Sequence, residues 1–283
     1  MGLELVKKKP QLRDFVRSRA HDLSLTLSTR PRSKSFLLFL LNSIPRSLRK
    51  YVIDVDSLSS KMCSLFEIRL SYGTFYCTDI DCIKIVSPLF ELEVLNEVVK
   101  VPRGGVFIDV GAHVGKYTVI ASKLVGSSGR VIAIEPHPLN YLLLLRNIYV
   151  NRCRNVYALR ICAWNLDGEV KLYISRKRSG THSTKRNYNH SGDYIVVRAM
   201  RVDSVIKSLN IKRADLMKID VEGAEYEVLE GAEDTLDTYR PDLVIEVFNM
   251  NKERVFEFLR KHRYRYRCLM RGDPHYIKAY SAM

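Results

Sequence analysis

Four short apolar runs in the chain each end at a carboxylate. Runs of this length, rich in β-branched residues and bounded by Gly, Pro or polar residues, are typical of buried parallel strands. In an open α/β sheet, ligands bind at the carboxyl ends of the strands. We therefore expect the acids to converge on one crevice that favours positive charge and hydroxyl groups and repels phosphates. A simpler interpretation, acids ending strands at a solvated edge, fits one or two of the runs. The runs are Val106–Asp109, Val131–Glu135, Leu216–Asp220 and Leu243–Glu246.

The rest of the pattern predicts the elements around these strands. Together they give an α/β fold with five parallel strands and a C-terminal antiparallel hairpin, which is a seven-stranded, mostly parallel sheet. We expect a basic N-terminal extension with helices and a small β element over 1–88, and the sheet domain over 89–283. The predicted elements are an antiparallel β element at 51–88, helices at 88–100, 224–231 and 251–262, a third parallel strand at 156–161, strands at 168–174 and 194–202 around a polar insert at 175–193 that is predicted to be a mobile loop, and hairpin strands at 264–270 and 275–280.

The first of the four runs continues into a glycine-rich turn and a helix start over residues 109–118. Gly111 and Gly115 give the backbone freedom to turn and let a ligand approach closely. Such a turn alone is weak evidence, but His113 stands where the dinucleotide fingerprint needs a glycine beside the pyrophosphate. Asp109 places negative charge where a diphosphate would lie. Both features disfavour NAD and favour a nucleoside that carries ammonium and sulfonium groups, which describes S-adenosylmethionine.

Glu135 ends the second strand, about 20 residues after Gly115, where an acid that holds ribose hydroxyls is expected. Pro136 follows it and stops the strand. The candidate cofactor-binding residues are Asp109, Gly111, Ala112, His113, Gly115, Thr118, Glu135 and Pro136.

A second motif, KIDVEGAE, covers residues 218–225. Lys218 and Asp220 are two apart on a strand and share a face. A Lys inside an apolar run needs a partner, because an unpaired buried ammonium is costly, and Asp220 is the obvious candidate. A purely structural interpretation is a salt-bridged strand end followed by a helix with Glu225 in its first turn and Gly231 as its cap. It accounts for Glu225 but poorly for Lys218.

These motifs resemble those of the FkbM-type methyltransferases, in the segments FIDVGAHVG (107–115) and KIDVEGAE (218–225). The segments 135–136, 163–164, 201–203 and 241–246 fit the same family, so the resemblance covers residues 90–280. It implies a class I, Rossmann-like fold and S-adenosylmethionine-dependent methylation of hydroxyl oxygens, often on sugars or polyketides. Family members often have a His shortly after the Glu that ends the fifth strand, whereas Phe248 occupies this region here, which bears on the type of acceptor.

We expect Asp220 or Glu222 to orient or deprotonate the acceptor hydroxyl. Lys218 would keep that carboxylate ionised. No metal ligand is predicted. The expected partner is a hydroxyl-bearing small molecule or glycan.

Composition adds limits and one rival function. No apolar run approaches the about 20 residues needed to span a bilayer. Residues 36–41 are apolar but short, which predicts a buried or interface helix, with peripheral membrane contact as the alternative. The six Cys show no CxxC pair, which predicts reduced thiols in a cytoplasmic protein.

Of the sequence features, the net charge of +15 agrees least with an enzyme that acts on a small molecule. Such a charge is common in proteins that bind nucleic acid or anionic surfaces. RNA methylation is therefore the rival function, and a catalytically inactive cofactor-binding module is a third. The alternating Arg and Tyr of 263–267 segregate to opposite faces of a strand, so one face could pack while the other stays solvated.

Overall fold

The computed structural model describes residues 65–175, 180–185 and 192–281. The chain forms two compact units, residues 1–80 and 81–283. In the described part of the first unit, strands β1 (Phe66–Leu70) and β2 (Gly73–Cys77) pair antiparallel, which confirms part of the β element predicted at 51–88. Its last part is wrong, because α5 (Ile80–Val86) is a helix. The apolar stretch at 36–41 and the basic segments before it lie outside the described residues. The division predicted after residue 88 stays a prediction.

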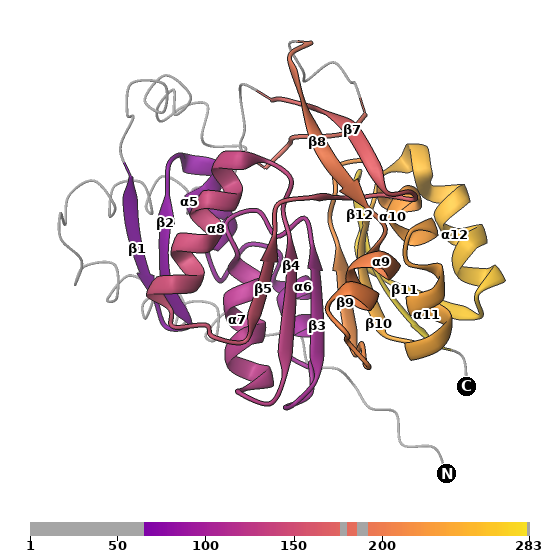
Figure 1. The fold of residues 1–283 in the computed structure, drawn as a ribbon, viewed down its shortest axis with the longest axis horizontal. Helices are drawn as coiled ribbons and strands as arrows, with labels where there is room; N and C mark the ends of the chain where they lie inside the picture. Colours follow the sequence, from indigo (N-terminus) through magenta and orange to yellow (C-terminus); the bar gives the residue numbers. More distant parts are fainter. Residues whose placement is uncertain (1–64, 176–179, 186–191, 282–283) are drawn as a thin grey trace. The chain divides into compact units, whose positions relative to one another are not determined.

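The second unit contains the predicted mostly parallel sheet (Figure 1). Within the described residues its strand order is β11-β12-β10-β9-β3-β4-β5, with seven strands. The order reverses direction at β3, which creates the switch point where ligands bind in open α/β sheets. This arrangement confirms the class I, Rossmann-like fold. The parallel strands are β3 (Val106–Val110), β4 (Arg130–Ile134), β5 (Val156–Leu159), β9 (Leu216–Ile219) and β10 (Asp242–Val247), and β11 (Tyr264–Met270) and β12 (His275–Ser281) form the antiparallel hairpin.

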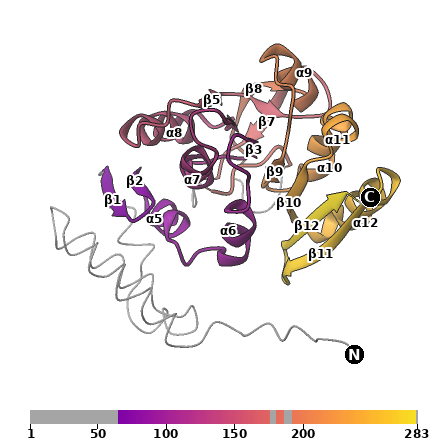
Figure 2. The same cartoon turned by 90° about the horizontal axis from the view of Figure 1, so that it is seen from below.

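Helices cover both faces of this sheet, so its central strands are apolar throughout rather than alternating. In Figure 2, α6 and α7 lie on one side of the central strands, and α10 and α11 lie on the other. The helices are α5 (Ile80–Val86), α6 (Leu92–Val98), α7 (Lys116–Val125), α8 (Pro138–Val150), α9 (Val202–Ser208), α10 (Glu225–Glu230), α11 (Glu233–Tyr239) and α12 (Lys252–Lys261), with a short 3-10 helix η1 (Asn249–Asn251) before the last.

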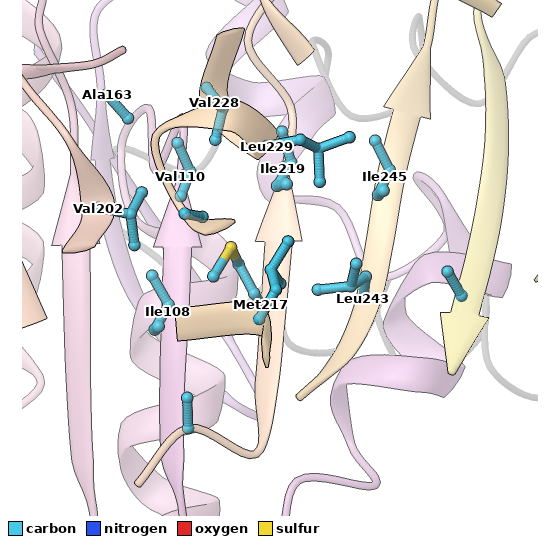
Figure 3. Packing of buried hydrophobic residues seen from close by; sticks show 14 of the residues in the cluster. Ile108, Val110, Ala163, Val202, Met217, Ile219, Val228, Leu229, Leu243 and Ile245 are labelled. Carbon is cyan, nitrogen blue, oxygen red and sulfur yellow. The ribbon is translucent and has the colours of Figure 1, made fainter. Parts of the chain in front are cut away.

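The two faces of the sheet bury different sets of side chains. Ile108 and Met217, from β3 and β9, pack with Leu243 of β10 beneath α9–α12 (Figure 3). Phe107 and Val244 point the other way, into the cluster beneath α6 and α7. Successive residues of a strand alternate between faces. The alternation therefore places Asp109, Lys218 and Glu246 on the α6/α7 face.

A small separate sheet accompanies the main one. The two strands predicted around the insert form, as β7 (Gly168–Tyr173) and β8 (Tyr194–Met200). They pair antiparallel, and β6 (Cys162–Ala163) adds a parallel strand to β8. Part of the insert between β7 and β8, at 176–179 and 186–191, lies outside the described residues. The remainder is not a free loop, because Ser183 and Tyr173 form a β-bridge with backbone hydrogen bonds of 2.8 and 3.2 Å.

The cysteines correct one sequence-based expectation. Cys77 and Cys82 are disulfide-bonded, so the prediction of reduced thiols is wrong for these two. Cys153, Cys162 and Cys268 are free. Because disulfides are rare in reducing compartments, the cysteines no longer support a cytoplasmic location, which stays a prediction. Among the described residues, no helix is long and apolar enough to cross a bilayer.

Gly231 follows α10, but it is not the left-handed cap that a glycine at this position usually provides. Its φ is −75°, a conformation that any residue adopts. The glycine is required by space instead: a Cβ at this position would lie 1.9 Å from the carbonyl oxygen of Trp164. Gly231 thus lets α10 pack against the segment after β6.

We expect Gly231→Ala to lower the free energy of unfolding by about 1–3 kcal/mol, because the added methyl group forces a backbone shift in a packed region. Denaturant unfolding followed by circular dichroism measures the change. Glu257→Ala, on the exposed side of α12, is the control and should stay within about 0.5 kcal/mol of the parent protein. Equal stability of Gly231→Ala and the parent protein would show that the Trp164 backbone yields freely.

Candidate functional site

A cavity of about 230 Å³ lies at the carboxyl ends of β3, β4, β9 and β10. It is lined by residues of both sequence motifs, together with residues from the segment before α6 and from β12. This is the edge at which the sequence predicted that the strand-end acids converge. Glu135, Asp220 and Glu246 do line the cavity, whereas Asp109 does not.

The two motifs meet through their backbones. Gly111, with φ of 79°, packs so closely on the turn after β9 that a Cβ would lie 1.7 Å from the carbonyl oxygen of Asp220. A side chain is therefore excluded at this position. The contact places the glycine turn after β3 beside the acids after β9.

One half of the cavity is formed by the predicted cofactor-binding turn. Gly111, Ala112, His113, Glu135 and Pro136 all line it. The Glu135 carboxylate accepts hydrogen bonds from the backbone N–H of His113 at 2.8 Å and of His137 at 2.9 Å.

Glu135 is 5% exposed, and its hydrogen bonds fix the orientation of its carboxylate. Burial raises the pKa of Glu135 to about 7, although the backbone donors act in the opposite direction. Each carboxylate oxygen can accept more than one hydrogen bond. Glu135 can therefore still accept hydrogen bonds from hydroxyl groups of a ligand.

Three predicted cofactor-binding residues lie behind the cavity wall. The Thr118 hydroxyl is buried and donates to the Asp109 carboxylate at 2.6 Å. Burial raises the pKa of Asp109. A Cβ on Gly115 would lie 2.6 Å from Leu144 Cδ1, so this glycine allows α7 and α8 to pack. Their positions make these residues supports of the turn.

The other half of the cavity holds the second motif. Lys218 is 2% exposed and pairs with Asp220 at 2.8 Å, which confirms the predicted partner. Burial opposes both charges, but the Asp220, Asp109 and Glu91 carboxylates raise the pKa of Lys218. Although burial alone would raise it, the pKa of Asp220 is lowered, chiefly by the Lys218 ammonium. The pair is therefore ionised.

Two further carboxylates, those of Glu222 and Glu246, gather beside Asp220 of this pair. One oxygen each from Asp220, Glu222 and Glu246 lies within 4.8 Å of the other two. Burial, followed by the charges of Asp220 and Glu222, raises the pKa of Glu246 well above its ordinary value. This half of the cavity is strongly acidic and suits a ligand that brings positive charge or donates hydrogen bonds.

Sequence reasoning missed the residues that close this half. Glu91, in a left-handed conformation with φ of 54°, accepts hydrogen bonds from Tyr117 Oη at 3.0 Å and Tyr276 Oη at 2.8 Å. Lys116 Nζ donates to the Phe90 carbonyl at 2.6 Å, and burial lowers the pKa of Lys116 to about 7. Glu91 and Tyr276 lie far from both motifs in the sequence, and no local motif marks them. Lys116 and Tyr117 do lie in the glycine-turn segment, but the pattern does not show that their side chains reach Phe90 and Glu91.

The described part of the insert also contributes to the wall. Thr181, His182 and Thr184 line the cavity. The His182 ring stacks on that of His137 with 3.9 Å between centroids. The insert therefore covers the cofactor-turn half, and composition alone predicted only a polar loop here.

Comparison with known proteins places this geometry in a family. The sequence model of the Methyltransferase FkbM domain matches residues 109–266, which contain both motifs. Methyltransferase sdnD of Sordaria araneosa is 24% identical over 167 residues, with 49% of this chain and 64% of that protein covered. Methyltransferase 1 of Beauveria bassiana (strain ARSEF 2860) is 26% identical over 158 residues, with 49% and 62% covered. The chain thus spans less than two thirds of the length of either relative.

Among solved structures, the methyltransferase FkbM from Methylobacillus flagellatus KT is 14% identical, with a TM-score of 0.47 and with 83% of this chain and 60% of that chain covered. Because the domain match spans more than half of the sequence, the chain belongs to the FkbM methyltransferase family.

Proposed function

We propose that the protein is an S-adenosylmethionine-dependent methyltransferase that methylates a hydroxyl oxygen on a sugar, a glycan or a related small molecule. The observation that carries the proposal is the contact between the two motifs at Gly111 and Asp220. It sets a half-cavity suited to a nucleoside beside a half-cavity of carboxylates, of which Asp220 is paired with the Lys218 ammonium. A methyl donor and a hydroxyl acceptor need this adjacency, because their reacting atoms must meet at near-attack distance.

The cofactor half fits the donor by its charge and its donor–acceptor pattern. Glu135 can accept hydrogen bonds from ribose hydroxyls while its backbone partners hold it in place. The sulfonium and ammonium groups of the donor would lie toward the acids of the second motif. A diphosphate would face the same acids and be repelled, so the dinucleotide alternative is disfavoured.

The acceptor half supplies the groups that a hydroxyl nucleophile needs. In the proposed reaction the acceptor oxygen attacks the methyl carbon in line, the carbon–sulfur bond breaks, and its electron pair returns to sulfur. The hydroxyl proton passes to Asp220 or Glu222 as general base. Lys218 keeps Asp220 ionised through the 2.8 Å pair, and it is thus a positioning residue.

The RNA alternative is less well supported. On β11, Tyr264 is buried, and Tyr266 stacks on Phe256 with 4.3 Å between ring centroids. Arg267 pairs with Glu97, whose carboxylate is 4% exposed. This part of the Arg–Tyr strand has structural contacts that account for it. The acidic acceptor half would also repel a phosphate backbone. The basic segment at 176–178 lies outside the described residues.

The first prediction from the proposed function is that the protein binds S-adenosylmethionine and not NAD. The physical reason is the negative charge around the turn after β3 together with the absence of the second glycine of the dinucleotide fingerprint at His113. Isothermal titration calorimetry of the purified full chain measures both ligands. Tight NAD binding with no S-adenosylmethionine signal would overturn the proposal.

The second prediction concerns pH. Burial raises the pKa of Glu135 to about 7. Only the ionised carboxylate can accept hydrogen bonds from two ribose hydroxyls with both of its oxygens. The affinity for S-adenosylmethionine should therefore fall about tenfold from about pH 8 to about pH 6, as the carboxylate protonates. Calorimetry across this range measures it. Glu135→Gln should bind weakly at every pH and lose the dependence, while Glu169→Gln should behave as the parent protein. An unchanged slope in Glu135→Gln would assign the pH effect to another group.

The third prediction separates cofactor binding from chemistry. Asp220→Asn and Glu222→Gln keep the shape of the side chain and remove its charge, so they should lower the methyl transfer rate about 10²–10⁴-fold where that carboxylate is the base. S-adenosylmethionine affinity should fall much less than the transfer rate, because the donor loses one favourable charge whereas the acceptor loses its base.

Transfer of radiolabelled methyl groups into cell extract of the source organism measures the rate, with and without ribonuclease. Glu93→Gln, on the exposed start of α6, is the control. Parent-level transfer by both variants would refute the carboxylate mechanism. Label that ribonuclease removes would instead establish RNA as the acceptor.

A further inference from the structure

We propose that Asp220, Glu222 and Glu246 bind one divalent cation, Mg²⁺ or Mn²⁺, in the acceptor half of the cavity. The inference deepens the proposed function and rests on it only for the position of the acceptor oxygen. The cation site itself stands on the geometry of the three carboxylates and on one buried oxygen.

The geometry of the cluster matches a shared ion. Asp220 and Glu222 come from the turn after β9, and Glu246 comes from β10, the strand beside it. One oxygen from each lies within 4.8 Å of the other two. Carboxylate oxygens at about 2.0–2.1 Å from an octahedral Mg²⁺ are about 3–4 Å apart. A small rotation of the side chains would therefore bring all three oxygens to one ion.

A second observation points to a missing positive partner. Glu246 is 7% exposed, and its Oε2 is a buried atom with no hydrogen-bond partner among the described residues. Nearly all buried polar atoms in proteins have a partner. The two residues that share the cluster with it, Asp220 and Glu222, are also acids and offer it no positive charge. A cation would satisfy this oxygen and remove the repulsion.

The nearby ammonium does not provide this partner. Lys218 Nζ donates to Asp220 Oδ2 at 2.8 Å and offsets one of the three negative charges. With all three carboxylates ionised, as metal binding requires, two negative charges are left, which a divalent cation would balance. Glu91 and Lys116 also line the cavity, and the Lys116 Nζ donates to the Phe90 carbonyl rather than to the cluster. The unbalanced negative charge is thus located on the three carboxylates of the cluster.

The chemical class of the ion follows from the donors. All three ligands are carboxylate oxygens, without a Cys or His in the cluster. Mg²⁺ and Mn²⁺ prefer hard oxygen ligands, whereas other metals prefer thiolate or imidazole ligands. Water or the acceptor hydroxyl would complete the shell. A cation here would position the acceptor oxygen and favour the loss of its proton.

The test is direct metal binding by the full chain. Protein treated with EDTA and dialysed is titrated with MnCl₂, by calorimetry and by the electron paramagnetic resonance signal of free Mn²⁺, and then with MgCl₂ in competition. We expect one ion per chain. Asp220→Asn, Glu222→Gln and Glu246→Gln should each weaken affinity at least about tenfold, because ligand charge sets affinity at such sites. Glu93→Gln is the matched surface control and should bind as the parent protein does.

Folding of each variant is checked by circular dichroism, and Glu246→Gln should melt no lower than the metal-free parent, because it removes a buried charge among acids. No uptake of either ion at millimolar concentration, or equal uptake by all three variants, would overturn the proposal. Binding of ethanolamine at the cluster without metal uptake would also overturn it and assign the acids to a substrate ammonium. S-adenosylmethionine titration of the same samples separates the two proposals, since either ligand can bind when the other does not.

Discussion

The ammonium of Lys218 is the charge around which this site is built. Leaving it unpaired in the protein interior would cost several kcal/mol. The sheet register places Asp109 of β3 directly opposite Lys218 of β9, and Asp220 meets the ammonium at 2.8 Å. The ring of Tyr117 lies 5.1 Å from Lys218 Nζ. Pairing β9 with β3 in this register, and packing α7 above it, thus solves the problem of the buried charge and at the same time holds an ionised carboxylate at the mouth of the sheet.

The same constraint explains why the cavity has two halves of different character. Asp109 is engaged by Lys218 and Thr118 behind the wall, so the glycine turn after β3 presents backbone and Glu135 to the ligand. The acids after β9 and β10 remain in front of the wall. Gly111 lets the two turns touch. The buried ammonium therefore decides which carboxylates face the ligand, and this divides the cavity into a donor side and an acceptor side.

How much of this could be predicted depends on the distance over which each signal acts. Short-range patterns predict the parallel strands, Glu135 and the Lys218–Asp220 pair. Short apolar runs are compatible with few elements, and a lone Lys in such a run needs a nearby carboxylate. Glu91 and Tyr276 could not be found, since their contact joins residues from the two ends of the second unit. The sequence predicts ligand approach at Gly115, whereas the space beside it is filled by Leu144. A sequence shows that a side chain is missing but does not show which neighbour occupies the space.

The contrast between the chain's net charge and its cavity bears on what the site can bind. The chain carries +15 overall, yet the acceptor half concentrates carboxylates that raise the pKa of Glu246 by burial and mutual repulsion. Like charges held together in a place with little water are unstable unless a proton, an ammonium group or a metal ion joins them. A proton on Glu246 would leave the Asp220 and Glu222 carboxylates side by side, and an ammonium group on the acceptor would restrict the acceptor to amines. A metal ion keeps the carboxylates ionised and leaves the acceptor free to be a neutral hydroxyl, which is why this occupant agrees best with the rest of the site.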